Sequence, residues 1–240
     1  MADLQESKIK NSTLTWQPLD AEQALEADIY SSWCNSNFIF KEENVESEIV
    51  GLRSPQVGGI FAALGYERSD SKSAATLVMP TGTGKTETIL SIVVAGRFKK
   101  TLVIVPSDAL REQTKNKFVQ LGLLRELGLI DENVLNPIVA TIKHGIDEQG
   151  DLDKLLEANV IVASASALSK FTSHYFNKLI NDCTHLIVDE AHHVTAATWA
   201  RVKSSFENKS VFQFTATPFR SDGSRVEGKI IFNYPLKKAQ

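Results

Sequence analysis

The chain has 240 residues, a length that suits one large domain or one domain with an appendage. Hydrophobic residues make up 42%, charged residues 23%, and the net charge is −3, so the chain lacks the strongly basic balance of many nucleic-acid binders. With two cysteines, no basic and apolar leader and no apolar run of membrane-spanning length, the composition argues against disulfide-rich secreted proteins and membrane proteins. We therefore expect a cytoplasmic protein with no membrane partner, although a narrow basic groove on this mildly acidic body would still allow nucleic acid to bind.

Residues 1–47 differ from the rest of the chain in charge. Between residues 17 and 50 there are eight acidic side chains and one base, Lys41. Alanine and leucine residues favour a helix over Asp20–Tyr30. Four large apolar side chains follow and are expected to be buried: Trp33, Phe38, Ile39 and Phe40. The pattern predicts an N-terminal accessory element, residues 1–47, that packs on a main domain formed by residues 48–240.

From about residue 50, short apolar runs rich in valine and isoleucine alternate with stretches of helical spacing. The predicted strands are Ala75–Met79, Thr101–Val105, Pro137–Ile142, Val160–Ala163, His185–Val188 and Val211–Phe214. The predicted helices are Glu87–Arg97, Asp108–Leu121, Leu152–Ala158, Thr172–Ile180 and Ala196–Phe206. This alternation favours an α/β fold with a mostly parallel central sheet and helices on both faces. Ligands of such sheets bind beyond the carboxyl ends of the strands, where four of these runs are followed by polar residues.

A glycine-rich turn separates the first of these strands from the helix that follows it. The turn reads Thr81-Gly82-Thr83-Gly84-Lys85-Thr86. Two glycines allow successive N–H groups to converge, the lysine can reach the β- and γ-phosphates, and Thr86 can ligate Mg²⁺. The helix start near the lysine adds its positive dipole end. Met79 stands where the strict phosphate-loop pattern has glycine, so an ordinary strand-to-helix turn stays open at this point.

Two adjacent carboxylates, Asp189 and Glu190, follow the apolar run Leu186–Val188. In this position the aspartate can hold Mg²⁺ and the glutamate can orient the water that attacks a γ-phosphate. The acids of a helix N-terminus would give the same pattern, but the phosphate loop earlier in the chain favours the nucleotide site. His192 is placed for a hydrogen-bonding relay with the glutamate, whereas its spacing from other histidines and cysteines disfavours a zinc site.

Three segments together resemble motifs I, II and III of the DEAH-type superfamily 2 helicases and translocases, in the order found in their first RecA-like motor domain. They are Met79–Thr86, Asp189–His192 and Thr215–Pro218. The run Phe219–Gly223 is similar to the branch that includes restriction-enzyme motor subunits. The resemblance covers roughly residues 50–235 and implies a RecA-like P-loop domain.

The resemblance also assigns roles to individual residues. Arg53 and Gln56 lie in a segment similar to the element ahead of motif I, in which a glutamine reads the adenine edge. Ser107 lies in a segment similar to motif Ia, where it would contact the nucleic-acid backbone, and it could also cap the helix that begins next to it. Thr215 and Thr217 would link the ATP state to a neighbouring domain.

These features predict the N-terminal motor domain of an ATP-dependent nucleic-acid helicase or translocase, with ATP and Mg²⁺ as ligands and DNA favoured over RNA. The sequence ends at Gln240, soon after the third motif, so we expect the second RecA-like domain, with its arginine fingers, in a longer protein. A nuclease or specificity domain is a further candidate partner, and the isolated chain should be weakly active. The alternative is a nucleotide-binding switch or scaffold module without productive hydrolysis.

Overall fold

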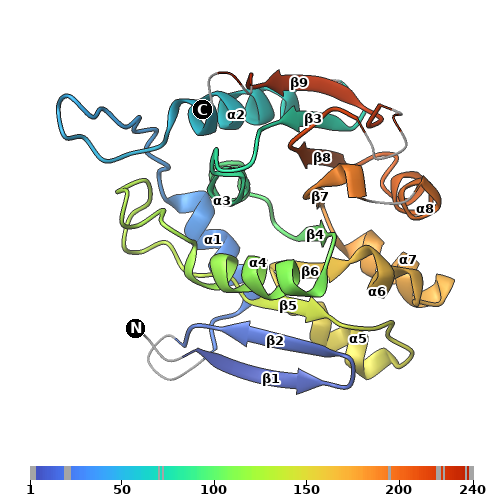
Figure 1. Ribbon diagram of the computed structural model, residues 1–240. Helices are drawn as coiled ribbons and strands as arrows, with labels where there is room; N and C mark the ends of the chain where they lie inside the picture. The colour runs from blue at the N-terminus through green and yellow to red at the C-terminus, as the bar shows by residue number, and fades with distance from the viewer. Residues whose placement is uncertain are drawn as a thin grey trace.

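Within the described residues, nine strands form one sheet in the order β1-β2-β5-β6-β4-β7-β8-β3-β9 (Figure 1). The computed structural model describes residues 4–18, 23–69, 71, 73–193, 196–219, 223, 225–235 and 237, and only the backbone of 193, 196–199 and 203. The strands are β1 (Gln5–Ile9), β2 (Ser12–Trp16), β3 (Ala75–Val78), β4 (Thr101–Val105), β5 (Val139–Ile142), β6 (Val160–Ser164), β7 (His185–Val188), β8 (Ser210–Thr215) and β9 (Lys229–Asn233). All pairs from β5 to β9 are parallel, whereas β1 and β2 are antiparallel additions.

Helices cover both faces of this sheet. They are α1 (Glu26–Asn35), α2 (Ser54–Glu67), α3 (Lys85–Ala95), α4 (Asp108–Gln120), α5 (Gln149–Leu155), α6 (Ala165–Ser169), α7 (Ser173–Asp182) and α8 (Ala196–Ser205), with a 3₁₀ turn at Ala191–His193. In Figure 1, α2, α3 and α4 lie on one side and α5 to α8 on the other. The connections β3–β4 and β4–β5 run across the sheet in one direction, whereas the connections from β5 through β6 and β7 to β8 run in the opposite direction. Because parallel crossovers are right-handed, the helices of these two groups of connections lie on opposite faces. The predicted α/β fold, with a mostly parallel central sheet and helices on both faces, is confirmed.

The six predicted strands all exist, and the central ones are buried along their whole length. Every residue of β4 and of β6 is buried, which explains why these strands read as continuous apolar runs rather than as alternating patterns. Among the five helices predicted after residue 50, boundaries shift by at most three residues, and the largest shift is at α5, which begins at Gln149 rather than at Leu152. No helix in the described part of the chain is long and apolar enough to cross a membrane.

The N-terminal region differs most from the expectation. A helix over Asp20–Tyr30 is wrong as predicted, because α1 runs over Glu26–Asn35, residues 23–25 are not helical, and residues 19–22 lie outside the described part. Ile39 and Phe40 are not buried but are 48% and 40% exposed. Phe40 instead stacks on the exposed ring of Phe61, with 4.8 Å between centroids, so the two rings shield each other at the surface.

A β-hairpin that the sequence analysis missed joins residues 5–16 to the main sheet. β2 pairs with β5 through Ser12–Thr15. The N-terminal residues therefore extend the same sheet, and Trp33 of α1, only 2% exposed, donates from its indole nitrogen to Leu135 O. The division into residues 1–47 and 48–240 stays a prediction.

Candidate nucleotide site

The glycine-rich turn adopts the left-handed conformation at both glycines, with φ of 85° at Gly82 and 87° at Gly84. The start of α2 holds this loop from outside. The guanidinium of Arg53 donates to Gly82 O at 2.9 Å, and the amide nitrogen of Gln56 donates to Gly84 O at 3.3 Å. A Cβ on Gly84 would lie 2.3 Å from that same amide nitrogen, so no other residue fits there without displacing Gln56.

The remaining loop residues close the turn and begin the helix that follows it. Thr83 is buried, and its hydroxyl donates to Pro80 O at 2.6 Å, which closes the turn. Thr81 is exposed, and Thr86 stands in the first turn of α3. The backbone N–H groups at the start of α3 lack helical partners and are available to an anion.

Lys85 joins the loop to the paired carboxylates. Its ammonium lies 2.9 Å from Glu190 Oε1 and donates to Met79 O at 3.3 Å, and both charged side chains are mostly buried, at 11% and 20% exposed. Met79 itself is fully buried, so its departure from the phosphate-loop pattern is absorbed by packing in the core. Lys85 and Glu190, which are 105 positions apart in the chain, thus meet at one end of the sheet.

The two carboxylates occupy different environments. Burial raises the pKa of Asp189 to about 6, the negative charge of Glu190 adds to the rise, and the ammonium of Lys85 opposes it. A buried carboxylate with a raised pKa lacks sufficient cationic partners, which is the electrostatic situation that a divalent cation would relieve. Glu190 has a φ of 50°, an uncommon conformation for a residue other than glycine, found mainly where the surroundings require it.

A relay leads from Glu190 to the end of β8. His192 Nδ1 lies 3.5 Å from Glu190 Oε2 and 2.9 Å from the hydroxyl of Thr215. Because Thr215 uses its one proton to donate to Thr217 O at 2.6 Å, it must accept from His192, so the imidazole carries its proton on Nδ1. The hydroxyl of Thr217 donates in turn to Phe219 O at 3.0 Å. The predicted members of motifs II and III therefore form one chain of contacts.

These residues fit a triphosphate with its magnesium. Glu190 Oε2 is buried and makes no hydrogen bond within the described part of the chain, so it has capacity for a further partner such as water. Space is open beside Gly82, where an added Cβ would meet nothing within 4 Å. Thr86 and Asp189 are the oxygen donors suited to Mg²⁺, which prefers hydroxyl, carboxylate and water ligands. Cations here would also counter the raised pKa of the aspartate.

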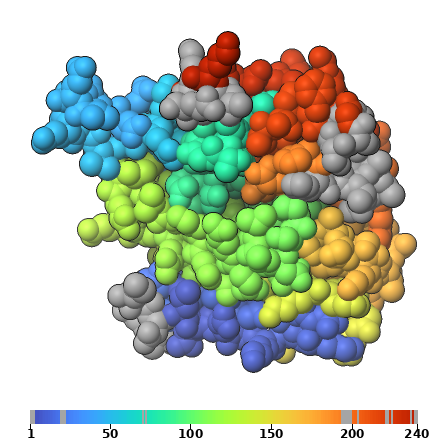
Figure 2. All heavy atoms as spheres, viewed as in Figure 1, coloured from blue at the N-terminus to red at the C-terminus, as the bar shows by residue number. Residues whose placement is uncertain are grey.

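A cavity of about 550 Å³ lies between the projecting segment 43–51 and the start of α2. Figure 2 shows this segment, in blue, standing out from the body of the molecule. Val45, Ile49 and Leu123 give the cavity apolar walls, and Arg53 and Gln56 line its inner end. Gln56 therefore faces a space where a base would fit, but its amide already bonds the loop and its oxygen accepts from Arg53 N at 2.8 Å.

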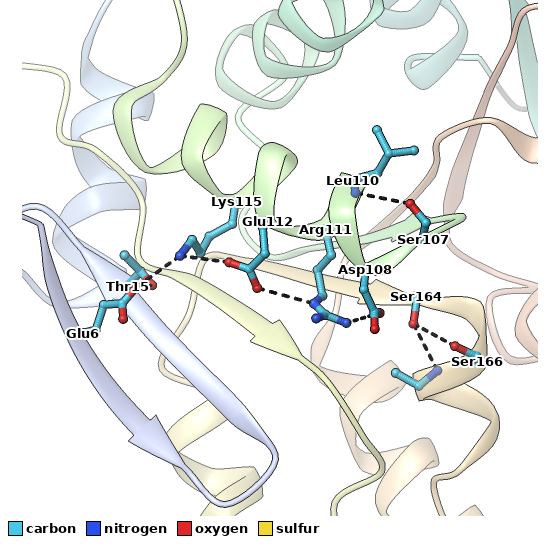
Figure 3. A network of polar contacts seen from close by, with 11 residues as sticks. Glu6, Thr15, Ser107, Asp108, Leu110, Arg111, Glu112, Lys115, Ser164 and Ser166 are labelled. Carbon is cyan, nitrogen blue, oxygen red and sulfur yellow. Dashed lines mark hydrogen bonds and ion pairs between the residues drawn. The ribbon is translucent and has the colours of Figure 1, made fainter.

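Serine hydroxyls mark the same edge of the sheet beyond β4 and β6. Ser107 is exposed and accepts from Leu110 N at 3.3 Å, so it caps α4 as expected. Ser166, which the sequence analysis missed, is exposed at the start of α6 and bonded to the buried Ser164 at 3.0 Å. The clue was a serine two residues after the end of a buried strand, the position that Ser107 takes after Val105 and Ser166 takes after Ser164. Figure 3 shows these hydroxyls at one end of a polar network along α4.

His185, four residues before Asp189 in the sequence, belongs to a different part of the molecule. Its ring stacks on Phe98 with 3.6 Å between centroids, and its Nε2 lies 3.1 Å from Glu67 Oε1. It stands at the start of β7, the opposite end of the strand from Asp189. His185 and His192 are therefore close in sequence but lie at opposite ends of β7.

Comparison with known families matches residues 43–220 to the family described as "Type III restriction enzyme, res subunit". The "Putative ATP-dependent RNA helicase L396" of Acanthamoeba polyphaga mimivirus is 26% identical over 148 residues, which are 61% of this chain and 24% of that protein. The UvsW helicase from Bacteriophage T4 is similar with a TM-score of 0.49 and 15% identity, over 82% of this chain and 62% of that one. A DEAD box protein from Methanococcus jannaschii is similar with a TM-score of 0.48 and 18% identity, over 68% of this chain and 43% of that one. The chain spans less than two thirds of each relative.

Proposed function

Since the chain belongs to the family described as type III restriction enzyme, res subunit, and is a helicase-type motor domain, we propose that it binds Mg-ATP and hydrolyses it to ADP and phosphate when paired with a second RecA-like domain. The observation that carries the proposal is the 2.9 Å contact between Lys85 and Glu190. It joins a phosphate-binding loop to a catalytic carboxylate at the carboxyl edge of a parallel sheet, where ligands of such sheets bind.

In this proposal Lys85 exchanges one anionic partner for another. Without nucleotide the ammonium pairs with Glu190, and with nucleotide it contacts the β- and γ-phosphates. The exchange frees the glutamate to accept a hydrogen bond from the attacking water. Nucleotide binding thereby makes Glu190 available to activate the water that attacks the bound nucleotide.

Thr86 and Asp189 would hold the magnesium ion. A bound ion would supply positive charge beside the phosphate oxygens that the loop orients. Thr81, Gly82, Thr83 and Gly84 would supply the backbone N–H groups that orient the phosphates. Arg53 and Gln56 would keep the loop in place and face the base, a role that stays a proposal.

The path from His192 through Thr215 to Thr217 would report the state of the site. Because it ends at Phe219 O, in the segment between β8 and β9, a change at Glu190 would have a route to this segment and, through it, to an adjoining domain. We propose Ser107 and Ser166 as backbone contacts for a nucleic-acid strand at the same edge. The DEAH subclass, a nuclease or specificity domain and a cytoplasmic location stay predictions.

The experiment that tests this function compares the chain with Lys85→Ala and with Lys99→Ala, an exposed lysine at the opposite edge of the sheet. Titration calorimetry should show Mg-ATP binding by the native chain and by the control, and none by Lys85→Ala. A longer protein that includes the second domain should hydrolyse ATP faster with single-stranded DNA or RNA. Both polymers are needed, because the resemblance to restriction-enzyme motors favours DNA whereas the mimivirus relative is named an RNA helicase.

A nucleotide-binding switch is the second candidate. It predicts tight Mg-ATP binding with no hydrolysis by the longer protein in the presence of either polymer. The paired carboxylates argue against it, since a module that only binds has no need of an activating glutamate.

A further inference from the structure

The β1–β2 hairpin lies outside the residues matched by the family, yet its turn stands at the functional edge of the sheet. Ser12 of β2 pairs with Ile142, the last residue of β5, so the turn at Lys10 and Asn11 lies beside the carboxyl end of that strand. Lys143 N donates to Asn11 O at 2.9 Å, which fixes the turn against the segment that follows β5. The hairpin thus continues the edge that carries the serines after β4 and β6.

Two lysines at this edge have no acidic partner of their own. Lys8 and Lys143 are exposed, and neither side chain makes a hydrogen bond or an ion pair within the residues that the structure describes. Lys10 differs, because it already pairs with Asp147 at 3.1 Å and with Glu148 at 3.0 Å. The two lysines are therefore the cations here that can take an external anion without breaking an internal ion pair.

Both lysines belong to the face of the sheet that carries α4. Side chains two apart on a strand share a face, so Lys8 lies on the same face as Glu6, which pairs with Lys115 of α4 at 3.1 Å. Glu6 pairs with Thr15, which pairs with Val139 of β5, and Lys143 comes four residues after Val139, so the alternation of side chains places it on the same face. The hydrogen bond from Lys115 lowers the pKa of Glu6, and the charge of Lys143 adds to the effect. Figure 3 shows Glu6 and Lys115 at the far end of the network that begins at Ser107.

The acids on this face are already engaged. Glu6 and Glu112 flank Lys115, and Asp108 binds the buried guanidinium of Arg111. Their charges are largely compensated by these two buried bases, so they oppose an approaching phosphate less than free carboxylates would. In Figure 2 the hairpin and α4 form one continuous surface.

We propose that Lys8 and Lys143 extend the strand-binding edge from the serines after β4 and β6 onto the N-terminal hairpin, where they contact backbone phosphates of single-stranded nucleic acid. From β4 to β1 the sheet spans four strand spacings, about 19 Å at about 4.8 Å each, enough for several nucleotides. Lysine binds phosphate as a point charge and reads no base, so DNA and RNA should behave alike. The inference rests on the proposed nucleic-acid function and assigns part of the strand-binding edge to the hairpin.

The test is the salt dependence of binding to fluorescein-labelled oligothymidylate and oligouridylate that are long enough to span the edge. The variant Lys8→Gln/Lys143→Gln is compared with Lys99→Gln/Lys154→Gln, which changes net charge equally at exposed lysines elsewhere. Anisotropy titrations between about 50 and 200 mM salt give the slope of log K against log salt. Each lost phosphate contact on a single strand should lower the slope by about 0.7, so the first variant should lose about 1.4 and the control nothing.

Equal slopes for the two variants, with clear binding by the native chain, would overturn the role of the hairpin and leave the proposed function standing. No binding of either oligonucleotide by the native chain at low salt would remove the nucleic-acid part of the proposed function as well. Thermal melting of both variants checks that a change in slope does not come from unfolding of the hairpin.

Discussion

Replacing Glu190 with glutamine should tighten Mg-ATP binding and slow hydrolysis at the same time. In the structure the ammonium of Lys85 is paired with this carboxylate at 2.9 Å, and both groups are mostly buried. Nucleotide must displace that contact before its phosphates reach the lysine. Glutamine keeps the shape and a neutral hydrogen bond but removes the negative charge that competes with the phosphates.

The size of the effect follows from the strength of that contact. A charge-assisted hydrogen bond is about twice as strong as a neutral one, whose net worth is about 1 kcal/mol, so the exchange favours nucleotide by about 1 kcal/mol. This corresponds to about fivefold tighter binding. Loss of the carboxylate that activates water should lower the rate of hydrolysis by about 10²–10⁴-fold.

Titration calorimetry of the chain measures the affinity, and single-turnover hydrolysis in a longer protein with the second domain measures the rate. Glu207→Gln, at an exposed glutamate away from the site, is the matched control for the charge change. An unchanged or weaker affinity in Glu190→Gln would show that the ion pair with Lys85 does not compete with nucleotide. An unchanged rate would remove Glu190 from the catalytic role.

Gly84→Ala should weaken Mg-ATP binding by about tenfold or more in calorimetry, because the backbone φ is 87° and the added Cβ would lie 2.3 Å from a side-chain amide. Gly65→Ala in α2 is its control; an added Cβ meets nothing within 4 Å there, and thermal melting should show about 0.5–1 kcal/mol more stability. Phe98→Ala should lower the free energy of unfolding in urea by about 3–5 kcal/mol, since the ring is fully buried and stacked on His185, and a loss below about 1 kcal/mol would contradict that packing. Burial pushes the pKa of Glu67 up, but hydrogen bonds, the largest from His185, outweigh it and hold the pKa below its ordinary value. The ionised carboxyl therefore stabilises the fold above its unfolded pKa, and this stability is lost as the pH falls through its folded pKa. Glu67→Gln should therefore show a smaller decline of Tm than the native chain below about pH 4.5. Parallel curves of Tm against pH for the two proteins would refute this.

The central sheet could be predicted because each of its buried strands is a continuous apolar run in the sequence. The strands β4 and β6 are buried on both faces, and only apolar residues satisfy such positions, so their runs stand out against the helices between them. The loop and the carboxylates were predicted at one edge for the same reason, since the strands that carry them are parallel. That Lys85 reaches Glu190 rather than Asp189 depends on side-chain conformations, which no spacing in the sequence encodes.

The hairpin could not be predicted, because its stability is not local. β1 is an edge strand with the polar sequence Gln5-Glu6-Ser7-Lys8-Ile9 and a mostly exposed burial pattern. What holds it is the pairing of β2 with β5, across more than a hundred residues of chain, and the ion pair from Glu6 to Lys115. A short, polar strand of this kind has no periodic apolar pattern until its partner is known.

The proposed nucleotide contacts and the proposed nucleic-acid contacts lie at the ends of neighbouring strands, and this adjacency limits how the domain could work. Asp189 N donates to Ile104 O at 2.9 Å, and Ser107 follows three residues later at the start of α4. Both groups stand on buried, hydrogen-bonded strands that have little freedom to move apart. Movement of a bound strand therefore requires a second surface that shifts relative to this edge. The chain of contacts from His192 through Thr215 ends at Phe219 O, between β8 and β9, and is our proposed link to such a surface, whereas the contacts along α4 stay within the domain.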